Sequence, residues 1–103
     1  MKSRRTKALE IPPAVKAAVW ERDNERCVIC ERWVPVFFAN AHFVAKSQNG
    51  LGVEQNILTL CDDCHRTFDN TVERPILREA LRRYLMSKYP DWDESKLYYK
   101  KYS

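Results

Sequence analysis

The chain has 103 residues, a length that favours one domain with a core too small to be very stable without a covalent or metal staple. Its 18 Lys and Arg against 14 Asp and Glu give a formal net charge of +4, which is compatible with a nucleic-acid partner but does not establish one. The sequence has no transmembrane run, and no apolar segment of a secretory signal follows the basic start. We therefore expect a cytoplasmic protein with no membrane partner.

The first half of the chain predicts a helix followed by short strands. Residues 1–10 are basic and are expected to form a solvated arm. The N-terminal helix is assigned to residues 11–26. It is predicted to start at Pro12 or Pro13, which suit a first helical turn; apolar residues then recur at helical spacing as far as Trp20, and residues 23–25 are expected to break it. Residues 33–44 are rich in β-branched and aromatic types and predict one or two short strands. The loop 47–52 contains both glycines of the chain.

The second half predicts two helices. One is expected to begin within the second cysteine pair and to run to about Asn70. Another should follow Pro75 and end at Pro90, because an apolar stripe recurs between the two prolines with arginines lying off it. We therefore divide the single domain into an arm, an N-terminal helix, a core and a C-terminal helical extension, at residues 1–10, 11–26, 27–70 and 71–103.

Four cysteines form two closely spaced pairs. Cys27 and Cys30 make one Cys-x-x-Cys, and Cys61 and Cys64 make the other. Two such pairs in a short chain are typical of a closed structural zinc site with four thiolate ligands. The alternative is disulfide bonding, which a reducing cytoplasm disfavours.

Both histidines of the chain lie close to the cysteine pairs. His42 falls between the two pairs, and His65 directly follows Cys64. The runs 41–50 and 54–65, Ala-His-Phe-Val-Ala-Lys-Ser-Gln-Asn-Gly and Glu-Gln-Asn-Ile-Leu-Thr-Leu-Cys-Asp-Asp-Cys-His, resemble the HNH endonuclease motif. The resemblance covers residues 27–70 and is greatest to the small phage and prophage HNH nucleases, some of which assist genome packaging. It implies an α+β fold, a ββα-metal finger with the four-cysteine zinc site, flanked by N- and C-terminal helices.

The resemblance also implies roles for particular residues. His42 would be the general base that activates water, a task that suits a neutral imidazole near neutral pH. Asn56 would hold the strand and loop of His42 in place, and His65 would bind a catalytic divalent ion that stabilises the leaving oxygen. The expected activity is hydrolysis of DNA phosphodiester bonds with low sequence specificity, with phage packaging proteins as further partners.

The chain departs from the family at Ala41, where a metal-binding residue commonly precedes the general base. A register that made His42 the metal ligand would leave Phe43 as the base, and the enzyme would be dead. The spacing from His42 to the following Ser and Gly favours the base register. Asp69 lies four residues after His65, on the same helical face, and we expect it to be the second ligand; a local cap or a salt bridge with Arg66 or Arg74 is the alternative.

The sequence thus implies two chemically different metals. The thiolates select Zn²⁺, whereas imidazole and carboxylate suit Mg²⁺, Mn²⁺, Ni²⁺ or Zn²⁺, among which the sequence does not choose. Two other functions remain open. The chain can be a non-catalytic zinc-binding module for DNA or protein, with Ala41 marking a degenerate site, or an interaction subunit that acts only beside a partner such as a packaging motor.

Overall fold

The computed structural model describes residues 3–70 and 74–100, and the side chains of all of these except Arg74. Residues 1–2, 71–73 and 101–103 of the predicted arm and extension lie outside the described residues. The helices and strands of the described part are α1 (Arg4–Leu9), α2 (Pro13–Arg22), β1 (Ala41–His42), β2 (Ile57–Leu58), α3 (Asp62–Asn70) and α4 (Arg74–Lys88). Four short 3₁₀ turns, at Val36–Phe38, Lys46–Gln48, Glu54–Asn56 and Glu94–Lys96, complete it.

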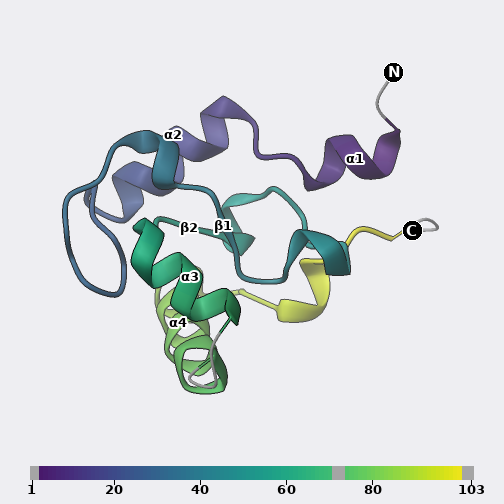
Figure 1. The fold of residues 1–103 in the computed structure, drawn as a ribbon. Helices are drawn as coiled ribbons and strands as arrows, with labels where there is room; N and C mark the ends of the chain where they lie inside the picture. The colour runs from purple at the N-terminus through teal and green to yellow at the C-terminus, as the bar shows by residue number, and fades with distance from the viewer. Residues whose placement is uncertain (1–2, 71–73, 101–103) are drawn as a thin grey trace.

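The predicted α+β fold is confirmed. Strands β1 and β2 form an antiparallel pair in which Ala41 lies opposite Leu58 and His42 opposite Ile57. Helix α3 follows β2 after three residues and packs against α4, while α2 contacts β2 (Figure 1). Together with the four-cysteine cluster described below, the two strands and α3 form the finger that the resemblance implied.

The main core lies between the strands and the helices α3 and α4. Its largest fully buried side chains include Phe43 after β1, Phe68 of α3 and Leu85 of α4. The Phe43 ring makes an edge-to-face contact with Trp92, and the Arg78 guanidinium lies 4.2 Å from the centroid of the Phe43 ring. The residue that directly follows His42 in the chain is therefore part of the core.

A buried ionic network anchors the strand pair to the helices on either side. Arg22, at the end of α2, forms a 2.8 Å ion pair with Asp23 and donates hydrogen bonds to the carbonyls of Glu54 and Ile57. Asp23 also accepts hydrogen bonds from the Thr59 backbone N–H and the Tyr84 hydroxyl. Because a buried carboxylate is costly unless it is paired and hydrogen-bonded, this network specifies one arrangement of α2, β2 and α4.

Two predicted elements differ from the structure at the N-terminal side. The expected arm contains a helix, α1, whose first turn is capped by the Ser3 hydroxyl and whose last residue, Leu9, is only 1% exposed. The segment 11–26 is helical only over Pro13–Arg22, which agrees with the predicted start at the prolines and the predicted break at residues 23–25. The helix ends there because Asn24 and Glu25 both adopt left-handed backbone angles, with φ of 58° and 62°, which a right-handed helix cannot contain.

The segment in which one or two short strands were predicted contains one short strand. Residues 33–44 hold only the two residues of β1, preceded by an isolated bridge at Trp33 and a 3₁₀ turn over Val36–Phe38. Trp33 and Phe37 are more than half exposed whereas Phe43 is fully buried, so the aromatic residues of this segment are divided between the surface and the core. In the described part of the chain no helix has the length and apolar character needed to cross a membrane.

Candidate functional site

The four cysteines converge on one point. Their sulfur atoms all lie within 4.8 Å of one another, and all four thiols are free. The Sγ atoms of Cys30 and Cys61 are 3.7 Å apart, too far for a disulfide bond. A tetrahedron with metal–sulfur bonds of about 2.3 Å places its sulfurs about 3.8 Å apart, so the spacing fits a zinc ion. The cluster is thus arranged as a closed structural metal site.

Each cysteine pair is shaped by its local backbone. The first pair lies in a turn closed by the Cys27 N–H donating to the Arg32 carbonyl at 2.8 Å, with Glu31 in a left-handed conformation at φ 64°. The second pair stands at the start of α3.

Burial, followed by hydrogen bonds and charge from the neighbouring cysteines, raises the pKa of the Cys64 thiol. Four thiolates in so small a volume therefore require a cation between them.

His42 is the last residue of β1, and its ring is fixed by the N-terminal helix. Its Nε2 donates to the backbone carbonyl of Leu9 at 2.9 Å, since a carbonyl can only accept. Burial lowers the pKa of His42 below its ordinary value of 6.5; the positive charges of Lys46 and His65 add to this effect and the Leu9 hydrogen bond opposes it. The imidazole is therefore neutral at physiological pH.

Asn56 immediately precedes β2 and is completely buried. Its Oδ1 accepts from the Val44 backbone N–H at 2.7 Å, and its Nδ2 donates to the carbonyls of Val44 and Leu51 at 3.2 and 2.8 Å. The Asn56 backbone carbonyl also accepts from the N–H of Phe43 at 2.8 Å. These contacts tie together both ends of the loop that follows His42.

We expect Asn56→Ala to destabilise the fold by about 2–4 kcal/mol. The substitution removes an amide with three hydrogen bonds and leaves two buried carbonyls and one buried N–H without partners. Chemical denaturation with circular dichroism measures the effect, and Gln55→Ala, at the exposed neighbouring position, serves as the control. Equal stability of the two variants would contradict the role assigned to Asn56.

His65 and Asp69 meet on the open face of α3. The Nε2 of His65 lies 3.3 Å from Oδ2 of Asp69, and their side chains are 30% and 48% exposed. No cysteine thiol or third acid joins them: among the described residues, the cysteines are the only group of three or more potential ligands found. Ala41 is fully buried and offers no ligand. The pair therefore provides two adjacent donors, one nitrogen and one oxygen, accessible to solvent.

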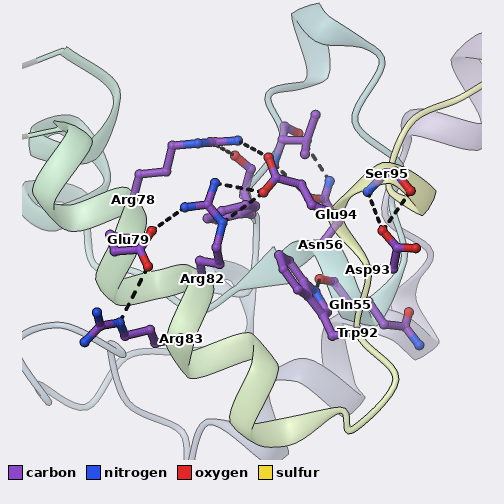
Figure 2. Close-up of polar contacts among 12 residues, drawn as sticks. Gln55, Asn56, Arg78, Glu79, Arg82, Arg83, Trp92, Asp93, Glu94 and Ser95 are labelled. Atoms are coloured by element: carbon purple, nitrogen blue, oxygen red, sulfur yellow. Dashed lines mark hydrogen bonds and ion pairs between the residues drawn. The ribbon is translucent and has the colours of Figure 1, made fainter.

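The structure adds two arginines that the sequence did not single out for the site. Figure 2 shows Arg78 and Arg82 of α4 reaching Glu94, with ion-pair distances of 3.0 and 2.8 Å. Arg78 also donates to the carbonyl of Phe43, the residue after His42, at 2.8 Å. In the sequence both arginines lie on the polar side of an amphipathic helix, and nothing there indicates their distant partner. Arg78 thus fixes the backbone beside His42 from the side of α4, and Arg82 shares its ion-pair partner Glu94.

Comparison with known proteins identifies one family. The family model described as HNH endonuclease matches residues 27–72, the segment that holds the cysteine cluster, the strand pair and α3. No curated protein and no solved structure matches the chain. The match agrees with the short antiparallel strands, the following helix and the four sulfur atoms gathered at one point. Residues 27–72 are therefore similar to the HNH endonuclease family over the segment that forms the finger.

Proposed function

We propose that the protein is a metal-dependent DNA endonuclease of low sequence specificity. The observation that carries the proposal is the His42 ring, one nitrogen of which is committed to the Leu9 carbonyl, within a segment that matches the HNH endonuclease family model. His65 adjoins Asp69. A neutral imidazole and a nitrogen–oxygen donor pair for a metal ion are the groups that hydrolysis of a phosphodiester requires.

In this proposal His42 is the general base. With its Nε2 hydrogen held by Leu9, the lone pair of a neutral imidazole is on Nδ1, which takes a proton from the attacking water. His65 and Asp69 would hold a divalent ion, whose positive charge would stabilise the leaving oxygen. Asn56 acts indirectly, by keeping the loop after His42 in place.

The donor set of α3 fits such an ion but does not choose among metals. An imidazole and a carboxylate one helical turn apart suit Mg²⁺, Mn²⁺, Ni²⁺ or Zn²⁺, while the four thiolates suit only a soft ion such as Zn²⁺. Free cysteines are compatible with the reducing cytoplasm that we propose as its location. A phage setting, with packaging proteins as partners, is the finer part of the proposal and rests on the resemblance of the motif alone.

A non-catalytic zinc-binding module is the second candidate, and Ala41 is the observation that favours it. The position is fully buried and apolar, so the site lacks the ligand that family members commonly have there. Such a module would bind DNA or protein with the same zinc-stapled fold. It differs from the nuclease in one measurable respect, because no divalent ion would induce cleavage.

A plasmid-nicking assay separates the two candidates. The purified protein should nick supercoiled DNA in the presence of Mg²⁺, Mn²⁺ or Ni²⁺, and chelation of the added metal should stop the reaction. DNA binding without nicking, by folded and zinc-loaded protein in all three metals, would favour the module.

His65→Ala should reduce the nicking rate by about 100-fold or more at low metal concentration, because one of the two protein ligands is lost. Part of the rate should return at higher metal concentration. Zinc content and thermal stability should remain normal, since His65 is outside the cysteine cluster. Arg66→Ala, which changes an exposed neighbour on α3, is the matched control. A normal rate and normal metal dependence in His65→Ala would remove this residue from the metal site.

A further inference from the structure

The partner of the His42 ring comes from outside the segment that the family model matches. Leu9 closes α1, eighteen residues before Cys27, and its carbonyl accepts the Nε2 hydrogen of His42 at 2.9 Å. The Leu9 side chain is 1% exposed, so this end of α1 is packed against the body of the protein. In Figure 1, α1 lies on the same side of the molecule as the loop that follows β1.

Two contacts attach α1 to that loop. The N–H of Gly52 donates to the Ala8 carbonyl at 2.9 Å, and Nε of Arg5 donates to Oδ1 of Asn49 at 2.6 Å. The loop is itself fixed to β2, because Asn56 donates to the Leu51 carbonyl at 2.8 Å. A chain of hydrogen bonds therefore runs from α1 through the loop to the strand that pairs with His42.

Gly52 is the position on which this attachment depends. A Cβ atom placed there would lie 1.8 Å from the backbone oxygen of Glu10 and 2.5 Å from its carbonyl carbon. The backbone of Gly52 does not adopt a positive φ, so a side chain is excluded by the approach of α1 and not by backbone strain. A methyl group at this position must displace the chain just after Leu9.

We propose that α1 is a positioning element of the catalytic site: the carbonyl of Leu9 holds the imidazole of His42 in the tautomer that carries its hydrogen on Nε2 and leaves Nδ1 free to accept a proton. The physical reason is that a neutral imidazole has one N–H, and the alternative tautomer would set a nitrogen lone pair against the carbonyl oxygen at 2.9 Å. The role of Nδ1 as the proton acceptor rests on the function proposed above. The assignment of the tautomer is independent of that function, because it rests on the hydrogen bond to Leu9 alone.

The inference has a structural consequence. Residues 27–72 contain the cysteines, both histidines and Asn56, but not the group that orients His42. The segment before Cys27 is therefore part of the active site and not only an accessory arm. In the described part of the chain, Nδ1 of His42 has no hydrogen-bond partner that could impose the same tautomer in place of Leu9.

Nitrogen-15 NMR of the imidazole rings tests the proposal directly, because the chain has only two histidines. His65→Ala assigns the signals of His42. In the wild-type protein, at a pH above the pKa of His42, the His42 ring should show the Nε2–H tautomer. In Gly52→Ala it should show a mixture with a substantial Nδ1–H population. Leu77→Ala, at a half-buried position of α4, is the control for general destabilisation and should retain the wild-type tautomer.

Two results would overturn the proposal: an Nδ1–H tautomer in the wild type, or an unchanged Nε2–H tautomer in folded Gly52→Ala. If Gly52→Ala does not fold, Leu9→Ala replaces it; this variant keeps the carbonyl but removes the buried side chain that anchors α1, and the same outcomes apply. The nicking rate of either variant should fall about tenfold or more with DNA affinity unchanged. A tautomer shift in a protein that never cleaves DNA would refute the nuclease proposal and leave the positioning role of α1 intact.

Discussion

Cys27→Ser is expected to abolish cooperative folding near room temperature. Cys27 is 1% exposed and belongs both to the sulfur cluster and to the main core, so its loss removes a metal ligand from the interior of the domain. Structural zinc binding contributes about 10–16 kcal/mol to folding in small zinc-dependent domains. Since the whole stability of a domain is typically about 5–15 kcal/mol, loss of most of that contribution exceeds what a 103-residue chain can spare.

The geometry of the cluster explains why other contacts cannot compensate. The site joins the turn that holds Cys30 to the start of α3 at Cys61, across thirty intervening residues. Without the metal, the first turn keeps only local hydrogen bonds and the bond from the Val28 N–H to the Thr59 carbonyl. The Arg22–Asp23 network still anchors α2 to β2, but it does not hold the first cysteine turn against the start of α3.

Metal analysis and thermal denaturation measure this effect together. Cys27→Ser should retain much less than one equivalent of zinc and should lose its cooperative thermal transition. Glu31→Gly is the matched control in the same turn. Because Glu31 has a φ of 64°, glycine should be tolerated there and should stabilise by up to about 1 kcal/mol. A Cys27→Ser protein that is zinc-free and still unfolds cooperatively near the wild-type temperature would exclude an essential structural metal.

The elements that the sequence predicted well are those encoded over short distances. The cysteine cluster follows from two local Cys-x-x-Cys turns, and α3 follows from a short polar segment directly after an apolar run. Asn56 was predicted to hold the loop of His42, and its hydrogen bonds to Val44 and Leu51 are of that kind. Each of these features is marked in the sequence by a short local motif, even where the contact that it makes is with a distant residue.

The features that the sequence did not reveal depend on distant partners. Helix α1 has six residues, too few to be stable alone. It is stabilised by hydrogen bonds with Asn49, Gly52 and the ring of His42. Asp23 was interpreted only as part of a break after the helix, because its bonds to Thr59 and Tyr84 span 36 and 61 residues. Helix propensity and the spacing of residues along the chain do not predict contacts between such distant residues.

The same distinction separates the two parts of the proposed active site. His65 and Asp69 share a face because the spacing of a helix puts them there, and their 3.3 Å approach was predictable from the sequence. The tautomer of His42 was not predictable, since it is set by a carbonyl 33 residues away. A proton acceptor needs both a suitable pKa and a defined lone pair, so half of its chemistry is determined outside the motif.

His42→Ala is expected to lower the nicking rate by about 100- to 10,000-fold, the usual contribution of a general base. This corresponds to a barrier increase of about 3–5 kcal/mol. The fold should persist, because the ring is only partly buried and donates a single hydrogen bond, to Leu9. Gln48→Ala, at an exposed position of the following 3₁₀ turn, is the matched control and should nick at the wild-type rate.

The pH dependence of kcat/KM distinguishes the loss of a base from the loss of a structural group. Only neutral His42 can accept a proton, and burial lowers its pKa below 6.5, so the wild-type rate should rise with pH and level off once the pH is above that lowered value. His42→Ala should lack this limb, because its residual rate no longer depends on the imidazole. If kcat/KM of the variant were lower but still rose with pH in the same way, a group other than His42 would be titrating. If it kept the full rate, water would be activated elsewhere, and the catalytic assignment of His42 would be wrong.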